Sequence, residues 1–452
     1  MRNTGRIKVR GVARRLTRTL AMGAGLVLLS ACSSLLDVDN PNNVTPSTLD
    51  DPTAASALVA GAINLNANAM SSMLNAYSII SDETWQSGSR DDYRLLDTGV
   101  LDNNTNEYLT AGYLVAMRAR WITEQTIQKV SKFEADGKLS DVQLLAKAYL
   151  MGAIIYDGMG NMYDDVAISD RTVAGANLGE ANMVQVYDSA VKWLDAGAAI
   201  ATGTNHANII AMRARVKFDR ALWTLLNPPG ATPANPLINN AGATADATQA
   251  LAEMSGDYIY DLTVDNTNSG DDASGGVGFE MNSRVEHTPD PSLTTIDPTN
   301  QKPTAVIATD PVTGLVDATA VKMINRFIKA PDINHPPMPV VSKREMYLIL
   351  AEAGLAAGNN AVFDTNINAL RALDGKAAYN GTGPTRLALL QWERRINLIF
   401  QGRRLNDMYR FGVKDSRWVA TSVAFKKPGC ELPIPLLERE ANSKITSAPV
   451  CQ

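Results

Sequence analysis

The sequence has few residues of the kinds that most enzymes use for chemistry. Its 452 residues include only three cysteines and three histidines. The motifs H-E-x-x-H, C-x-x-C and G-x-S-x-G are all absent, so a zinc hydrolase, a dithiol redox site and a nucleophile elbow each lack their minimal parts. The glycines near Gly276 have no lysine beside them to form a phosphate-binding loop. We therefore expect no catalytic residues, no metal site and no cofactor.

Acidic side chains leave one route to catalysis, because a glycosidase needs only two carboxylates placed across a cleft. The adjacent acidic pairs are Asp50–Asp51, Asp91–Asp92, Asp164–Asp165 and Asp271–Asp272. Neighbouring aspartates in polar stretches are typical of solvated turns. A polysaccharide hydrolase is therefore the least favoured function for this chain.

Long apolar runs are also scarce after the N-terminal region. The run 144–155 is interrupted by Lys147 and predicts a core helix instead of a membrane span. Residues 1–31 differ, because they contain seven basic and no acidic residues, followed by an apolar stretch and the sequence LSAC at Leu29–Cys32. This pattern is typical of a lipoprotein signal peptide. We expect cleavage before Cys32 and a lipid anchor on Cys32.

Removal of this leader changes the charge of the chain. It leaves 35 basic and 47 acidic residues, a formal net charge of −12. An acidic surface repels nucleic acid and anionic lipid headgroups at long range. We therefore expect no nucleic-acid partner, and attachment to a membrane through the N-terminal lipid alone.

Two cysteines remain once Cys32 carries lipid. Cys430 and Cys451 lie about twenty residues apart in a chain that is expected to be exported, where oxidation is permitted. They either form a disulfide, which would contribute about 3 kcal/mol for a loop of this length, or remain two free thiols.

Apolar spacing predicts a mostly α fold. Apolar residues recur three and four positions apart through 51–227 and 342–412, which we interpret as a helical core of tetratricopeptide-like helix pairs. The segment 228–341 contains 13 of the 21 prolines, and only 246–262 within it is predicted to be helical, with Asp246 as N-cap. We expect this segment to form loops on the scaffold, followed by a C-terminal segment over 413–452.

The run 393–412, ERRINLIFQGRRLNDMYRFG, combines many charges with large apolar residues. Leu389, Trp392, Ile396 and Ile399 share one face of a predicted helix that Gly402 can end. Charges carried so close to an apolar face must be paired. The sequence therefore predicts a structural charge network, with these members: Glu393, Arg394, Arg404, Asp407 and Arg410.

This run resembles the C-terminal signature of SusD/RagB-like nutrient-uptake lipoproteins, ERR-x-E-L-x-F-E-G-x-R-x-x-D-L-x-R-x-G. The residues that match are Glu393, Arg394, Leu398, Phe400, Gly402, Arg404, Asp407, Arg410 and Gly412. Asn397 and Gln401 replace glutamates, which removes two carboxylates from the expected network, and Leu405 replaces an aromatic residue. The sequence LPIP at Leu432–Pro435, with Glu438 and Asn442, is similar to the family's closing segment. Four earlier segments also resemble the family in the same order: Leu35–Ala62, Leu144–Ile168, Met183–Ile200 and Glu345–Asn359.

The resemblance implies a single SusD-like domain over 32–452. It also implies a lipoprotein on the outer face of the outer membrane, which binds a glycan or peptide nutrient. In that family the protein closes like a lid over a TonB-dependent, SusC-like transporter. A helical-repeat envelope scaffold with no small ligand is the alternative.

A glycan site needs an aromatic platform for the sugar face and polar groups for its hydroxyls. The polar stretch Ser81–Tyr93 offers both, so the candidate ligand-binding residues are Asp82, Trp85, Arg90 and, at the next helix start, Tyr108. Alternatively, Trp85 does not contact a ligand and is a core residue that anchors this stretch. Trp121, Trp193, Trp223 and Trp392 lie in helical patterns and are expected in the core.

Overall fold

The computed structural model describes residues 48–170, 172–263, 276–446 and 451. Cys32, the expected lipid-anchor residue, lies outside them. The chain divides into two compact units, Met1–Asp51 and Pro52–Gln452. In the first unit the described part is a short 3-10 helix, η1 (Thr48–Asp50), closed by a hydrogen bond from the Asp51 N–H to the Thr48 carbonyl oxygen. All other described elements belong to the second unit.

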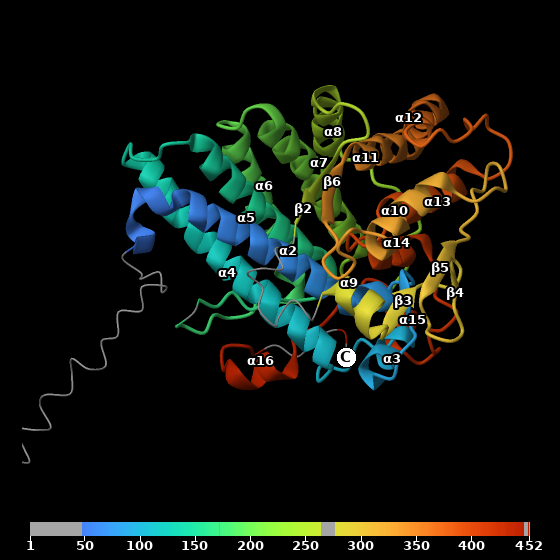
Figure 1. The fold of residues 1–452 in the computed structure, drawn as a ribbon, viewed down its shortest axis with the longest axis horizontal. Helices are drawn as coiled ribbons and strands as arrows, with labels where there is room; N and C mark the ends of the chain where they lie inside the picture. Colours follow the sequence, from blue (N-terminus) through green and yellow to red (C-terminus); the bar gives the residue numbers. More distant parts are fainter. Residues whose placement is uncertain (1–47, 171, 264–275, 447–450, 452) are drawn as a thin grey trace, which may run out of the picture. The chain divides into compact units, whose positions relative to one another are not determined.

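The second unit is mostly α, as the apolar spacing predicts. Long helices in its first half pack against one another in chain order (Figure 1). Its elements up to residue 253 are η2 (Pro52–Ala54), α2 (Ala55–Ile80), α3 (Asp91–Asp97), α4 (Glu107–Ala135), α5 (Val142–Met162), η3 (Glu180–Asn182), α6 (Val184–Ala198), α7 (Gly203–Leu226) and α8 (Ala241–Glu253). This arrangement agrees with the expected stack of helix pairs.

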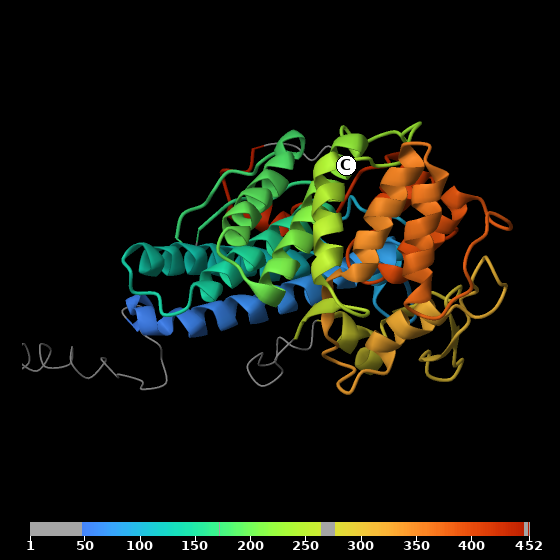
Figure 2. The same ribbon diagram turned by 90° about the horizontal axis from the view of Figure 1, so that it is seen from above.

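The second half adds a further group of helices. α8 lies between α7 and the α11–α12 pair in both views (Figures 1 and 2). The helices are α9 (Val277–Phe279), η5 (Glu280–Arg284), α10 (Ala318–Ile328), α11 (Lys343–Ala356), α12 (Asn360–Ala372), α13 (Arg386–Asn397), α14 (Arg404–Phe411), α15 (Val423–Lys426) and α16 (Leu436–Ala441).

The strands are short and pair two by two. Each pair is antiparallel: β1 (Thr84–Gln86) with β3 (His287–Pro289), β2 (Ile259–Leu262) with β6 (Met338–Ser342), and β4 (Thr294–Ile296) with β5 (Pro303–Val306). The β1–β3 pair fixes the chain after α2 against the loop-rich segment, and the β2–β6 pair connects the two ends of that segment.

Small residues let α2 and α4 approach closely. Ala62, Ala69 and Ala76 of α2 are almost fully buried. On the facing side of α4, a Cβ added to Gly112 would lie 3.2 Å from the Met73 Cα atom. Because this contact is to backbone, a larger side chain would push the two helices apart.

The predictions for the segment 228–341 were partly wrong. The helix expected over 246–262 is α8, which begins earlier because the side chain of Asn240 accepts a hydrogen bond from the Ala243 N–H at 2.9 Å. Asp246 is therefore not the N-cap, and its carboxylate instead pairs with Arg213 at 2.7 Å. Residues Ile259–Leu262 form strand β2.

The segment also contains a helix that the sequence did not reveal. α10 is capped by the Asp317 side chain, which accepts from the N–H groups of Thr319 and Ala320. Its apolar face is buried through Met323, Ile324 and Phe327. It was missed because proline-rich and polar stretches flank it on both sides and dominate the local composition.

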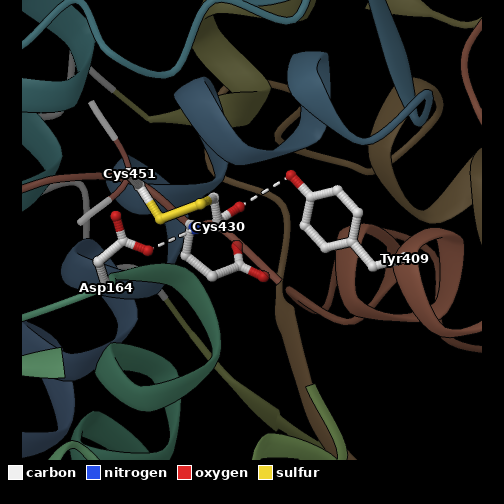
Figure 3. Close-up of a disulfide and its surroundings, with 5 residues drawn as sticks. Asp164, Tyr409, Cys430 and Cys451 are labelled. Atoms are coloured by element: carbon white, nitrogen blue, oxygen red, sulfur yellow. Dashed lines mark hydrogen bonds between the residues drawn. A yellow bond between two sulfur atoms is a disulfide. The ribbon is translucent and has the colours of Figure 1, made fainter. Parts of the chain in front are cut away.

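The C-terminal segment is joined to the helical core by hydrogen bonds and is closed on itself by a disulfide. Cys430 and Cys451 form this disulfide, with their Cα atoms 5.6 Å apart (Figure 3). The Tyr409 hydroxyl donates to the Cys430 carbonyl oxygen at 2.8 Å, and the Leu432 N–H donates to the Met162 carbonyl oxygen at 3.1 Å. The closing segment is thus fixed to α14 on one side and to the end of α5 on the other.

Buried ion pairs hold α13 and α14 against the rest of the unit. This network consists of the charged residues of 393–410 and their partners, and we call it the clasp. At its centre Asp407 lies between Arg394 and Arg410, at 2.8 Å from each. Both arginines also contact Glu352 of α11, Arg394 at 3.5 Å and Arg410 at 3.1 Å. Two cations and two carboxylates thus form a closed, balanced set whose side chains are at most 4% exposed.

Other members of the clasp reach further. Arg403 contacts Asp157 of α5 at 2.6 Å and also Asp219 of α7. Arg404 donates to both carboxylate oxygens of Asp82, at 2.7 and 2.8 Å. Each arginine fork therefore connects α14 or the residue before it to elements more than 180 positions earlier.

Glu393 closes the clasp at its other end. Its carboxylate accepts from Arg371 at 2.6 Å and from Lys376 at 2.9 Å, and all three side chains are at most 4% exposed. These contacts fix α13 to α12 and to the turn that follows it.

The two missing carboxylates of the signature are replaced without an unpaired charge. Asn397 Oδ1 accepts from Arg344 at 3.0 Å, and Gln401 Oε1 accepts from Arg215 at 3.0 Å. Carboxylates from outside the signature neutralise both arginines: Asp257 and Asp374 lie 2.6 Å from Arg344, and Glu345 lies 2.5 Å from Arg215. Amides suffice at these two positions because they only have to accept a hydrogen bond.

We predict that Asp407→Asn lowers the free energy of unfolding by about 3–5 kcal/mol, because it leaves two buried arginines with one shared carboxylate. Denaturant unfolding followed by circular dichroism measures this. Asp364→Asn is the matched control, since Asp364 also pairs with an arginine, Arg386, but in a partly exposed position. Equal, small losses in the two variants would contradict a stabilising role for the clasp.

Candidate functional site

The ligand-binding residues predicted from the sequence do not converge in the structure. Asp82 follows α2 with a φ of +56°, and Arg404 occupies both of its carboxylate oxygens. Burial alone would raise the pKa of Asp82, but Arg404 and Arg395 lower it below its ordinary value. Asp82 is therefore a charged partner in the clasp, with both carboxylate oxygens engaged by Arg404.

Tyr108 also has a structural position. Its ring stacks on Tyr93 with ring centroids 3.5 Å apart, and Tyr93 meets His287 edge-on at 5.1 Å. The Tyr108 side chain is only 8% exposed. Because one of its faces is covered by Tyr93 and the ring is buried, Tyr108 does not offer a platform to a sugar.

Trp85 and Arg90 remain nearer the surface. Trp85 lies in β1 opposite Thr288 of β3 and is half-buried, which partly supports the alternative that it anchors the stretch. Within the described residues its buried indole N–H has no hydrogen-bond partner. Arg90 is exposed just before α3, where its guanidinium lies 3.5 Å from Glu107 and 3.9 Å from Glu286.

A groove with a tryptophan in its wall is lined by residues of α4, the loop 167–170 and α16. Its volume is about 510 Å³, within the range of small-molecule sites. The lining residues are Met117, Arg118, Arg120, Trp121, Ile122, Ala167, Ser169, Asp170 and Glu438. It therefore combines an apolar, aromatic wall from α4 with acidic groups from the two facing segments.

The floor of the groove is rigid. Arg120 is 2% exposed, and its guanidinium binds Glu124 at 2.8 Å and the Ser169 carbonyl oxygen. The Tyr156 hydroxyl donates to the same Glu124 carboxylate at 2.5 Å. These contacts hold α4, α5 and the loop 167–170 in one arrangement, so the groove does not depend on the ligand for its shape.

Polar groups stand at the rim of the groove. Arg118 is exposed and, among the described residues, has no carboxylate partner. Asp170 accepts from the N–H groups of Thr172 at 2.7 Å and Val173 at 2.6 Å, and these hydrogen bonds lower the pKa of its carboxyl group. The rim therefore presents a fixed carboxylate and an available guanidinium, both suited to hydroxyl or amide groups.

Trp121 was expected in the core and instead lines this groove. The core face of α4 runs through Tyr113, Ala116 and Val130, all fully buried. A second, weaker apolar stripe runs through Leu114, Met117 and Trp121 at spacings of three and four. A helix that is apolar on two faces is the signal that could have identified this surface from the sequence.

Comparisons with known proteins agree with the geometry of the C-terminal half. A model of the SusD family matches residues 322–446, which contain the charged run 393–410 of the clasp. Over these residues the chain is similar to the SusD family, as the signature at 393–412 predicted. The region of the SusD-like protein that carries the signature runs from α10 to α16, and it includes every clasp residue from Glu393 to Arg410.

Solved structures share the SusD-like fold. A SusD superfamily protein from Bacteroides thetaiotaomicron has a TM-score of 0.59 at 15% identity, covering 88% of this chain and 99% of that one. A SusD-like carbohydrate binding protein from Bacteroides vulgatus has a TM-score of 0.54 at 14% identity, covering 80% and 83%. A SusD superfamily protein from Bacteroides fragilis has a TM-score of 0.58 at 14% identity, covering 88% and 99%. No curated protein matches the sequence.

In the part of the chain that the structure describes, no helix is both long and apolar enough to cross a membrane.

Glu83, next to Asp82, is a buried carboxyl with an unusual pKa. One of its oxygens accepts from the Phe400 N–H at 2.8 Å, and the other has no partner among the described residues. Burial raises its pKa from 4.5 to about 8. Glu83 therefore stays protonated in the native state at pH values where it has lost its proton in the unfolded chain. Its contribution to the free energy of unfolding is fully present below pH 4.5 and is lost as the pH rises towards 8.

We predict that Glu83→Gln stabilises the protein at pH 8.5 by a few kcal/mol and has little effect at pH 4.5, because the amide has no proton to lose. Unfolding free energies at the two pH values measure the difference. Glu134→Gln, an exposed substitution on α4, is the control. If the difference in unfolding free energy between Glu83→Gln and the wild type is the same at both pH values, the raised pKa is contradicted.

Proposed function

We propose that this SusD-like protein is a non-enzymatic surface lipoprotein that captures a nutrient, a glycan or a peptide. It then delivers the nutrient to a TonB-dependent outer-membrane transporter, over which it acts as a lid. The observation that carries the binding role is the rigid groove between α4 and α16, with Trp121 in its wall and polar groups at its rim.

A glycan fits this groove chemically. The flat face of Trp121 suits the C–H face of a sugar ring, while Arg118 and Asp170 suit its hydroxyl groups. A solved relative of the same fold is titled a SusD-like carbohydrate binding protein, and another is titled a putative sugar binding protein. These likenesses support a glycan ahead of a peptide as the ligand.

The same groups do not favour hydrolysis. A general acid in a glycosidase needs a raised pKa, whereas hydrogen bonds from two backbone N–H groups lower the pKa of the Asp170 carboxyl. We therefore propose that the ligand leaves the protein unchanged.

The segment with Trp85 and Arg90 is a second place on this chain for the same ligand. Both residues lie towards the surface in the stretch that the sequence singled out, where Arg90 is exposed and Trp85 is half-buried. Asp82 and Tyr108 would support that site only indirectly, through the clasp and the aromatic cluster.

We predict that Trp121→Ala weakens binding of a glycan found on an array by more than about tenfold, because loss of an aromatic anchor costs about 2 kcal/mol. Isothermal titration measures the affinity, and the melting temperature checks the fold. Leu114→Ala, an exposed residue of the same helix outside the groove, should bind normally. A loss confined to Trp85→Ala would move the site to the Trp85 segment. Absence of any glycan or peptide ligand would favour the scaffold alternative.

The proposed partner and location rest on the family resemblance and on the expected lipid anchor. Lipid on Cys32 would hold the acidic protein at the outer membrane without a basic surface, and the transporter below it would receive the ligand. We propose that the protein faces the outside of the cell, since nutrient capture requires access to the medium.

We predict that the lipidated protein, isolated from its native membranes, brings a large TonB-dependent transporter with it. Mass spectrometry of the purified complex identifies the partner. Cys32→Ser, which removes the lipid attachment atom, should release the protein into the soluble fraction. Repeated purification of the lipidated protein alone from intact membranes would contradict the transporter role.

A further inference from the structure

The side chain of Asn442 lies where two walls of the groove meet. It directly follows α16, the wall that supplies Glu438, and it is only 4% exposed. Its Nδ2 atom lies 2.9 Å from the Gly175 carbonyl oxygen, 3.2 Å from Glu438 Oε1 and 3.4 Å from Ser169 Oγ. One buried amide group thus joins α16 to the loop that begins at 167.

Hydrogen bonds extend this connection to the third wall. The Ser169 Oγ atom accepts from the Gly175 N–H at 2.9 Å, and the Ser169 carbonyl oxygen accepts from Arg120 of α4. Gly175 lies so close to the start of the loop that an added Cβ would be 1.9 Å from the Ile168 carbonyl oxygen. A continuous path of polar contacts therefore runs from α4 through the loop to Asn442 and α16.

α16 depends on such contacts because it has no apolar anchor. Helices in proteins owe most of their stability to the packing of an apolar face, yet none of the six residues of α16 is buried. At its start the Leu436 N–H donates to the Asn104 carbonyl oxygen at 2.9 Å, and at its end stands the Asn442 amide. The position of Glu438 on the groove wall therefore depends on Asn442.

The same contact orients the Glu438 carboxylate. Asn442 engages Oε1, and among the residues that the structure describes no donor engages Oε2. Asp170 in the facing loop is held in a similar way, since the donors of Thr172 and Val173 engage its Oδ1 atom. A carboxylate with one oxygen fixed can accept from a sugar hydroxyl through the other. The groove therefore offers two oriented acceptors, one on each side of the Asn442 amide.

We propose that Asn442 is the positioning residue of the groove: it holds the Glu438 carboxylate and the loop of Asp170 in the arrangement that binds a glycan. This role rests on the proposed function, because it concerns the same groove. Asn442 acts through its neighbours and needs no contact with the glycan. It also gives a role to the closing segment, since Glu438 and Asn442 are the two polar residues after LPIP that resemble the family.

A first measurement requires no glycan. In the mature protein labelled with fluorotryptophan, fluorine NMR gives a resonance for Trp121, assigned with Trp121→Phe, and hydrogen exchange follows the amides of 172–178 and α16. Asn442→Asp preserves the size of the side chain and the oxygen that accepts the Lys444 N–H at 3.0 Å, but its carboxylate cannot donate. It should shift the Trp121 resonance and raise exchange in both segments by about tenfold, because a hydrogen bond to a charged group is lost.

Asn366→Asp is the matched control. The Asn366 amide also donates to a carbonyl oxygen, that of Val362 at 2.9 Å, but it lies on α12, which contributes no residue to the groove. This variant should leave the Trp121 resonance and both exchange rates as in the wild type. An Asn442→Asp variant that behaves like the control would overturn the proposal.

A second measurement is a double-mutant cycle on affinity. Isothermal titration uses the oligosaccharide that binds the wild type most tightly on an array of plant and cell-wall glycans. Asn442→Ala and Glu438→Gln should each weaken binding by about tenfold, and the double variant by far less than the product of the two losses, because one residue acts through the other. Melting temperatures check that each variant is folded. Losses that multiply fully, or an unchanged affinity in Asn442→Ala, would overturn the positioning role.

The two measurements distinguish this role from the proposed function. A wild type that binds no glycan on the array contradicts glycan capture, and fluorine NMR and hydrogen exchange then still decide whether Asn442 positions the groove. A wild type that binds a glycan as tightly as Asn442→Ala does contradicts the positioning role alone.

Discussion

The pairing of buried arginines by carboxylates is the constraint on which the rest of this structure depends. Arg394 and Arg410 share the carboxylates of Asp407 and of Glu352 on α11. Arg403 binds Asp157 and Asp219, and Arg404 binds Asp82. An unpaired charge in any of these positions would cost several kcal/mol. An arginine fork fixes both distance and direction when it binds a carboxylate through two nitrogens. The clasp therefore sets where α13 and α14 lie against the helices of the first half. Hydrogen bonds from Tyr409 to Cys430 and from Leu432 to Met162 fix the segment that follows, and the disulfide closes that segment into a loop.

This use of charge separates structural from functional residues. Asp82 was attractive as a ligand contact because it lies in a polar stretch with Trp85, yet its carboxylate is needed by Arg404. Groups available to a ligand lie where pairing is incomplete, as at Arg118 on the rim of the groove. In this chain the dense cluster of charges is structural, and the proposed binding site lies at a sparser one beside an aromatic face.

Much of the fold could be predicted from the sequence. The helices α2, α4, α5 and α11 lie within the ranges 51–227 and 342–412 that were predicted to be helical, because apolar spacing reports directly on the buried face of a helix. The signature at 393–412 also identified the family. The helix α10 could not be predicted, because its proline-rich flanks obscure an eleven-residue pattern. The bounds of α8 were wrong because Asn240 and Asp246 are equally plausible caps until Arg213 is seen to pair with Asp246.

The sequence by itself determined the family, the helical class, the charged members of the clasp and the expectation of a lipid anchor, because each of these depends on residues that are near one another in the chain. The tertiary structure decided which carboxylate neutralises which arginine, that Tyr108 is stacked, that Trp121 lines a groove, and that Asn442 joins two walls of that groove. The physical reason is that burial, pairing and convergence are properties of neighbours in space. Only folding brings residues such as Asp82 and Arg404, 322 positions apart, into contact.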